Sequence, residues 1–361
     1  MKLLEQLTQA PGVPGREDRV RDLILQEIKG LFDEVSVDPL GSVIAVRRPT
    51  TSAPHADAEP PSGGEASGSP TRVMLAAHMD QIGFLVRHVG DDGFLRVQNV
   101  GGFDPRNLFA RLVTVATSGG DLPGVLNPGG KPVHTASPED RKKIPEISDL
   151  LVDLGLPKEQ VKERVKIGDM VTLKVPFTLV GNTVVSQCLD NRVACWVAIE
   201  AVRKLAQDET PHAAEVHAVF TVQEEVGLRG AMTSAYTVRP DIGIGIDVTL
   251  CVDTPGSPED QRCTVQGEGA ALTVMDGASI GDPGILADFE RLAEQHEIKA
   301  QRSILARGGT DTAGIQRAAG GTRAFTLSCP TRYIHTAVEM VHLDDLHACR
   351  DLLAAYLAYV K

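Results

Sequence analysis

Four apolar runs in this sequence end in acidic or histidine side chains. The residues at these ends are His78, Asp80, Asp190, Glu224, Glu225 and Asp247. A carboxylate at the end of a buried strand is costly unless it is paired, hydrogen-bonded or bound to a cation. In an open α/β sheet, ligands bind beyond the carboxyl ends of the strands. We therefore expect these side chains to gather in one polar site at an edge of the sheet.

The residue types in these runs indicate a metal site. Histidine and carboxylate ligands without thiolates suit Zn²⁺, Co²⁺ or Mn²⁺ better than a soft metal ion. In an extended segment, the side chains of His78 and Asp80 point to the same face. Asp80 can then accept a hydrogen bond from the imidazole nitrogen that does not hold the metal, which fixes the tautomer.

The adjacent glutamates Glu224 and Glu225 need a special backbone to serve one site together. Consecutive residues of a strand point to opposite faces, so the strand must end there and turn. One glutamate would then hold metal while the other faces the substrate.

Each motif also has an ordinary structural interpretation when it stands alone. A His-x-Asp pair occurs on protein surfaces, a Glu-Glu dipeptide is usually solvated, and Asp190 can cap the helix that follows it. His134 fits a loop, and His217, inside an apolar strand, fits a core position. The functional interpretation depends on the motifs occurring together.

Composition excludes several classes of protein. The chain has 36 Lys and Arg against 48 Asp and Glu, a net charge of −12. Such an acidic surface disfavours binding to nucleic acid and to anionic membranes. No run approaches the roughly 20 apolar residues that span a bilayer, and the N-terminus lacks the apolar region of a signal peptide. The six cysteines form no CxxC pair, as expected of buried thiols in a reducing compartment. We expect a cytoplasmic protein.

The N-terminal part of the chain predicts helices followed by strands. Residues 2–9 and 16–32 carry apolar side chains at helical spacing, and 34–38 and 42–48 are short strand-like runs. Residues 49–71 are dominated by Pro, Ser, Gly, Ala and Thr, which predicts a flexible loop. Because strand-like runs flank this loop, we expect these runs to pair as a long hairpin and the loop to connect them.

The remaining chain predicts an α/β protein with an insertion. Residues 88–180 are rich in Gly and short β-type runs, with one charged helical piece at 137–155. From Cys188 onward, apolar strands alternate with helices, which indicates a sheet covered on both faces. We expect a mixed sheet with helices on both faces, formed by 1–87 and 181–361, and a small β-rich inserted domain at 88–180.

Six motifs follow one another along the chain in a characteristic order. They are AHMDQIGFLV, LDNR, EEVGLRGA, GIDVT, GGTDTAG and RYIHTAVE. In sequence and order they resemble the tetrahedral-shell aminopeptidases. These are the glutamyl/leucyl and deblocking aminopeptidases of metallopeptidase clan MH, and some of them are also called endoglucanases. The resemblance covers essentially the whole chain and implies a zinc-exopeptidase-like fold.

The resemblance also implies two divalent ions, Zn²⁺, Co²⁺ or Mn²⁺, in each subunit. Their implied ligands are His78, Asp190, Glu225, Asp247 and His335. His78 would share one ion with Asp247, and Glu225 would share the other with His335. Asp190 would bridge the two ions. Only the resemblance supplies His335, since RYIHTAVE by itself is an ordinary polar segment.

By the same resemblance, Glu224 is the general base and Asp80 the partner of His78. Glu224 would take a proton from a metal-activated water and pass it to the leaving amine. The implied activity is removal of N-terminal residues from short or unfolded peptides. The inserted domain would build dimers and then a hollow dodecamer.

The chain departs from the family pattern at a few positions. Gln81 stands where Glu is common, and Thr336-Ala337 stands where Ser-Pro is common. These positions lie beside implied ligands without being ligands. Glu268 stands where members often have Lys; if it lines the pocket, it should disfavour acidic N-terminal residues by charge repulsion.

Three other functions are compatible with parts of the pattern. A dipeptidase or an acyl-amino-acid deacylase of the same clan would share the metal site. A glycosidase would need two carboxylates free of metal, whereas these carboxylates come with histidines. A non-catalytic metal-binding scaffold would have no need of Glu224 beside the implied ligands.

Overall fold

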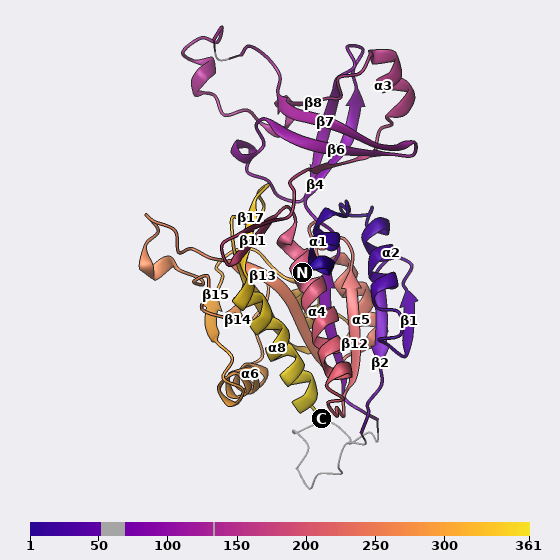
Figure 1. Cartoon of the computed structure of the whole chain (residues 1–361), viewed down its shortest axis with the longest axis vertical. Coiled ribbons are helices and arrows are strands. Elements are labelled where there is room, and N and C mark those ends of the chain that lie inside the picture. The colour runs from indigo at the N-terminus through magenta and orange to yellow at the C-terminus, as the bar shows by residue number, and fades with distance from the viewer. Residues whose placement is uncertain (52–68, 133) are drawn as a thin grey trace.

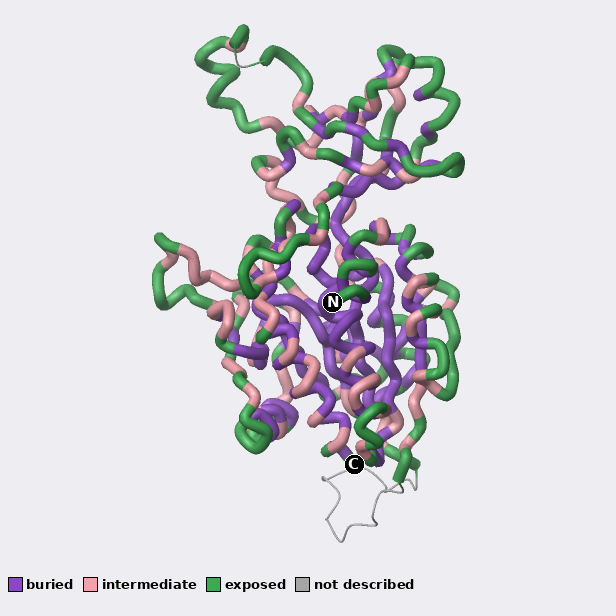
Figure 2. Tube along the Cα trace, in the orientation of Figure 1, coloured by how far each residue is buried: buried purple, intermediate pink, exposed green. Residues whose placement is uncertain are grey.

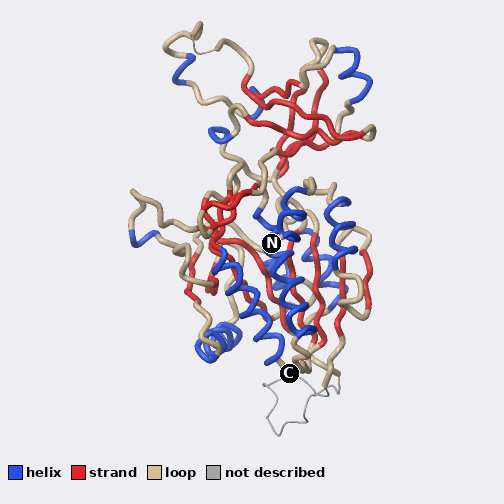
Figure 3. Tube along the Cα trace, viewed as in Figure 1, coloured by secondary structure: helices blue, strands red, loops and turns tan. Residues whose placement is uncertain are grey.

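A large mixed sheet and a smaller closed barrel make up the chain (Figures 1 and 3). The computed structural model describes residues 1–51, 69–132 and 134–361. Helices cover both faces of the sheet, and the barrel lies beyond one of its ends. The predicted α/β class with a mixed sheet is confirmed.

The sheet has 11 strands within the described residues. Along its main path they are β1 (Glu34–Val37), β2 (Val43–Arg47), β12 (Glu215–Thr221), β3 (Arg72–His78), β13 (Ile242–Leu250), β16 (Arg323–Arg332), β17 (Glu339–His342), β11 (Thr183–Ser186) and β10 (Thr178–Val180). Beside β16 lie β14 (Ala270–Met275) and then β15 (Ala300–Ile304). The neighbouring strands β12, β3, β13 and β16 run parallel. Their carboxyl ends therefore meet at one edge.

Both faces of the central strands are buried (Figure 2). On β3, Val73 and Leu75 belong to one apolar cluster, whereas Met74 and Ala76 belong to another, as the alternation of strand side chains requires. The first cluster includes side chains of α1 (Lys2–Gln9), α2 (Asp18–Glu27), α4 (Leu189–Gln207), α6 (Pro283–Gln295) and α8 (Leu343–Tyr359). The second includes α5 (Arg229–Val238) and α7 (Asp311–Arg317).

The barrel has its own apolar core. Its strands close in the order β4 (Gly83–Val89), β5 (Leu95–Val100), β8 (Leu150–Asp153), β7 (Gly120–Pro128), β6 (Arg111–Thr117) and β9 (Met170–Leu173). Helix α3 (Lys158–Arg164) packs against this core through Val161. The chain enters the barrel directly after β3 and leaves it before β10.

Two predictions about local structure are wrong. The strands that flank residues 49–71 do not form a hairpin, because β12 lies between them, antiparallel to β2 and parallel to β3. Most of the predicted loop, 52–68, lies outside the described residues. The predicted helix at 137–155 consists of 3₁₀ turns at Asp140–Lys142 and Ile147–Asp149 followed by β8. Pro145, which cannot donate a helical hydrogen bond, divides this segment.

No helix in the described part of the chain combines the length and the apolar character that a membrane span requires. The six cysteines all lie in described ranges and are free thiols, and four of them are buried.

Candidate active site

A pocket of about 510 Å³ opens at the carboxyl ends of the parallel strands. Its polar end is formed by His78, Asp190, Glu224, Glu225, Asp247 and His335. His78 is the last residue of β3, Asp247 lies in β13, and Glu224 follows the end of β12. All the strand-end side chains that we expect to gather, except Asp80, therefore line this pocket.

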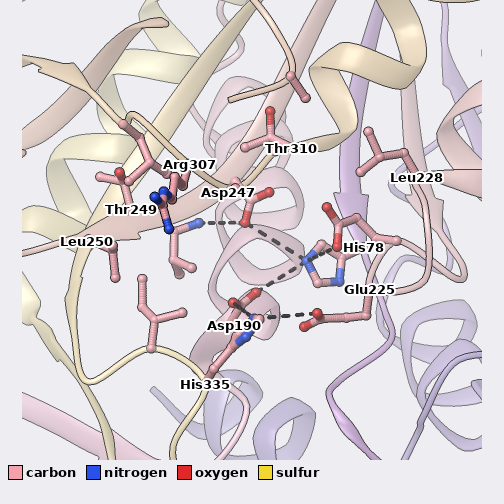
Figure 4. Close-up of a pocket in the computed structure, with 17 residues that line it drawn as sticks. His78, Asp190, Glu225, Leu228, Asp247, Thr249, Leu250, Arg307, Thr310 and His335 are labelled. Atoms are coloured by element: carbon pink, nitrogen blue, oxygen red, sulfur yellow. Dashed lines mark hydrogen bonds and ion pairs between the residues drawn. The ribbon is translucent and has the colours of Figure 1, made fainter. Parts of the chain in front are cut away.

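Asp190 lies between the two histidines of the pocket (Figure 4). Its Oδ1 is 3.3 Å from Nε2 of His78, and its Oδ2 is 3.3 Å from Nε2 of His335. The same nitrogen of His335 is 3.4 Å from Oε2 of Glu225. On the other side, Nε2 of His78 is 4.0 Å from Oδ1 of Asp247. Asp190 thus belongs to two groups of donor atoms at once.

These donor groups have the composition of metal sites. Ligand atoms of His78, Asp190 and Asp247 lie within 4.8 Å of one another, and so do those of Asp190, Glu225 and His335. A third group of the same size joins His78 to both glutamates. Neutral imidazole and carboxylate are ligands that suit Zn²⁺ and related divalent ions.

The buried carboxylates of the pocket also fit a bound cation. Burial raises the pKa of Glu224, Glu225 and Asp247, and neighbouring carboxylates raise it further. Oε1 of Glu225 is buried without a hydrogen-bond partner among the described residues. Divalent cations stabilise charged carboxylates that are crowded in this way. The residues present therefore fit metal ions at both donor groups.

Asp80 connects His78 to the turn that carries the two glutamates. Nδ1 of His78 is 3.1 Å from the backbone oxygen of Asp80 and 3.5 Å from its Oδ1. The carboxylate of Asp80, fully buried, accepts hydrogen bonds of 3.0 Å from the backbone nitrogens of Glu224 and Glu225. The hydrogen-bond partner of this imidazole nitrogen is thus the backbone oxygen of Asp80 and not, as the sequence predicts, its carboxylate. The carboxylate holds the turn.

The backbone turns immediately after β12, which lets both glutamates line the pocket. β12 ends at Thr221, and Gln223 has a left-handed φ of 57°. Oε1 of the buried Glu17 accepts hydrogen bonds from the backbone nitrogens of Gln223 and Gly15, at 3.1 and 2.8 Å. The sequence pattern does not single out Glu17, because its surroundings resemble an ordinary helix start.

Asp190 does not cap the helix in which it lies. Its backbone is non-helical, with φ −75° and ψ 106°, and α4 begins without a side-chain cap. Both carboxylate oxygens face the histidines instead. Of the two histidines left aside, His217 is buried with Nε2 2.8 Å from Oε1 of Glu215, and His134 is exposed. Neither lines the pocket.

The rest of the pocket wall is mainly apolar and backbone. It is formed by Leu228, Val248, Thr249, Leu250, Ala278, Leu305, Arg307, Gly308, Gly309, Thr310 and Ile334. Arg307 is the basic side chain of this wall (Figure 4) and forms no ion pair with any described acidic residue. Glu268 does not line the pocket, so the condition for charge repulsion of acidic substrates there is not met. Its exposed carboxylate lies 3.8 Å from Nζ of Lys299.

Comparison with known proteins places this pocket in a family context. Residues 63–352 match the model of the M42 glutamyl aminopeptidases. The chain is 32% identical to a lysyl aminopeptidase of Pyrococcus furiosus, over 100% of this chain and 97% of that protein.

Solved structures agree with this match. An aminopeptidase of Desulfurococcus kamchatkensis superposes with a TM-score of 0.88 at 34% identity, covering 99% of this chain and 94% of that one. The TET1 peptidase of Pyrococcus horikoshii gives 0.83 at 32% identity, covering 99% and 98%, and can assemble into a tetrahedron or a large octahedral shell. Another structure, of PhTET1, contains a dodecamer.

Proposed function

Since the chain belongs to the family of M42 glutamyl aminopeptidases, which are peptide hydrolases, we propose that it is a dinuclear-metal aminopeptidase that removes N-terminal residues from short peptides. The observation that carries the two-metal proposal is the position of Asp190. Its two oxygens face different histidines, at 3.3 Å each, as a bridging carboxylate would. His78 and Asp247 would complete one ion's ligands, and Glu225 and His335 the other's.

The metal ions that these residues fit are Zn²⁺, Co²⁺ or Mn²⁺. When bound, such ions polarise a scissile carbonyl and lower the pKa of a water molecule at the site. Glu224 is the group that we assign to proton transfer. Its Oε2 lies 3.7 Å from Nε2 of His78, it is buried, and burial raises its pKa. It would take the proton of the attacking water and return it to the leaving amine.

The acidic lining supports a preference for a free N-terminus. A protonated α-amine of a peptide carries a positive charge, and the carboxylates at the polar end of the pocket would attract it. The apolar wall would receive the N-terminal side chain. An acyl group on the amine would remove this charge.

Assembly is the second part of the proposal. We assign the barrel, whose strands run from Gly83 to Leu173, to dimer formation and the part of the chain that forms the large sheet and its helices to catalysis. The expected insertion at 88–180 starts inside β4 and takes in β10, which belongs to the large sheet. Leu112 and Val125 face each other across β6 and β7 and are 61% and 44% exposed. Neighbouring exposed apolar side chains often mark an interface. Because related TET peptidases form tetrahedral shells and a dodecamer, we propose a dodecamer built of dimers.

A panel of matched peptides tests the activity. The protein, reconstituted with Zn²⁺ or Co²⁺, should release the first residue of Leu-Gly-Gly and of longer free-amine peptides, and should leave N-acetylated versions intact. Faster cleavage of the acetylated peptides would indicate a deacylase. Cleavage restricted to dipeptides would indicate a dipeptidase. Metal binding without hydrolysis of any member would support the scaffold alternative.

A further inference from the structure

Glu339 joins the backbones of two proposed metal ligands. Its Oε2 accepts a hydrogen bond of 2.8 Å from the backbone nitrogen of Asp190, and its Oε1 accepts one of 2.9 Å from the backbone nitrogen of His335. The side chain is buried, with 1% of its surface exposed. One carboxylate therefore holds two segments that are far apart in the sequence.

The strand pairing explains how Glu339 reaches both segments. It is the first residue of β17 and pairs with Ser186, the last residue of β11. The chain continues from β11 to Asp190 at the start of α4, and His335 lies just before β17. Glu339 thus lies where the two ligand-bearing segments come together.

Both segments have a backbone that regular structure does not hold in place. His335 has a left-handed φ of 61°, which residues with a β-carbon rarely adopt. Asp190 has non-helical angles inside the first turn of α4. A hydrogen bond from each backbone nitrogen to the same carboxylate fixes both segments relative to each other. The two side chains then meet, with Nε2 of His335 3.3 Å from Oδ2 of Asp190.

We infer that Glu339 is a positioning residue for the ion that Asp190, Glu225 and His335 would hold. It belongs to none of the three donor groups in the described chain, so it acts through the backbone of the ligands and not as a ligand. The inference rests on the proposed metal site and adds a residue whose substitution should loosen that site selectively. Groups that support ligands in this way typically contribute a 10–100-fold factor to metal affinity.

A second buried carboxylate provides a matched control. Asp345 accepts hydrogen bonds of 2.7 Å from the backbone nitrogens of Gly267 and Gly269, and it is fully buried. It does not line the pocket. Asp345→Asn therefore removes the same kind of interaction without touching a proposed ligand.

Two substitutions of Glu339 separate geometry from charge. Glu339→Gln replaces one acceptor oxygen by an amide that cannot accept from a backbone nitrogen. Glu339→Asp keeps the charge but shortens the side chain, so it cannot span both nitrogens at the same distances. If only the loss of charge mattered, metal affinity would fall in Glu339→Gln and stay unchanged in Glu339→Asp.

The test is titration of the chelator-treated full chain with Zn²⁺ by calorimetry and with Co²⁺ by its visible absorption. Wild type should bind two ions. Glu339→Gln should bind one of them about 10–100-fold more weakly, and Glu339→Asp about tenfold more weakly, while the other ion changes less. Asp345→Asn should match wild type. Circular dichroism checks the fold of each variant. If Glu339→Gln does not fold, the metal affinity of Glu339→Asp decides the result.

Wild-type metal affinity in Glu339→Asp would overturn the positioning role, and so would an equal loss of metal affinity in Asp345→Asn. Either result would leave the proposed metal site intact. Wild-type protein that takes up fewer than two ions would instead overturn the proposed dinuclear function, and the positioning role with it.

Discussion

The backbone nitrogen of Glu224 donates a hydrogen bond of 3.0 Å to Oδ1 of Asp80. This bond ties the end of β3 to the turn after β12, and the second oxygen of Asp80 does the same for Glu225. The group assigned to proton transfer and a proposed ligand are therefore held by one buried carboxylate. Their relative position depends on Asp80 as well as on the strands.

Asp80→Asn should disturb this arrangement. Asn keeps one carbonyl oxygen and places an amide against the other backbone nitrogen, which leaves a buried donor unsatisfied. We expect the free energy of unfolding to fall by about 1–3 kcal/mol and kcat/KM to fall about 10–100-fold. Thermal unfolding and peptide hydrolysis measure the two effects. Asp345→Asn is the control: it should lose stability and keep kcat/KM. Equal activity loss in both variants would contradict a specific role for Asp80.

Glu17 should make stability depend on pH. Burial, with help from Asp80, raises the pKa of Glu17 from 4.5 to about 7. The folded chain therefore binds this proton more tightly than the unfolded chain. The stability that protonated Glu17 contributes to the folded chain is fully present below about pH 4.5 and is lost as the pH rises through about 7. This difference corresponds to at most about 3 kcal/mol.

Glu17→Gln should remove that dependence. Both hydrogen bonds use Oε1, which the amide oxygen of Gln can replace. The difference in melting temperature, variant minus wild type, should increase from pH 5.5 to pH 8.5. Scanning calorimetry at several pH values measures this difference. A difference that stays constant, or one that favours wild type more strongly at pH 8.5, would be inconsistent with the raised pKa.

Arg307 should favour substrates with an acidic group. It lines the pocket, and no described carboxylate pairs with it. A carboxylate at the substrate's N-terminal side chain would form a charge-assisted hydrogen bond there. Arg307→Gln should lower kcat/KM for Glu-p-nitroanilide by roughly tenfold relative to the Leu analogue. Glu268→Gln is the control and should leave this ratio unchanged. An unchanged ratio in Arg307→Gln would exclude the contact.

The exposed pair on the barrel should matter for assembly. Leu112→Asp with Val125→Asp places two charges on the proposed interface, where they would be desolvated without partners. Light scattering should show the wild type as a dodecamer and the double variant as smaller species. Leu179, 59% exposed on β10, offers a control outside the barrel, and Leu179→Asp should still assemble. Unchanged assembly of the double variant would remove this pair from the interface.

The side chains at strand ends could be predicted from the sequence, because each strand is a continuous apolar run and its end is visible in the residues next to it. Apolar runs that end in His78, Glu224 and Asp247 indicate strands and their edge directly. The partners of these residues could not be predicted in this way. Glu17 and Glu339 act through backbone nitrogens of distant segments, and only the folded chain brings these together. The hairpin prediction failed for the same reason, since β12, far along the chain, separates β2 from β3.

The measurement that tests the central claim most directly compares the two adjacent glutamates under identical metal loading. Metal content by elemental analysis and turnover are measured on Glu224→Gln and Glu225→Gln. We predict that Glu224→Gln keeps both ions and loses roughly 10²–10⁴-fold in turnover, with less change in substrate affinity. Glu225→Gln should bind one ion more weakly, because an amide oxygen holds a hard cation less well than a carboxylate. A Glu224→Gln protein that sheds an ion while Glu225→Gln retains two would reverse the assignment, and full activity of Glu224→Gln would contradict its role in proton transfer.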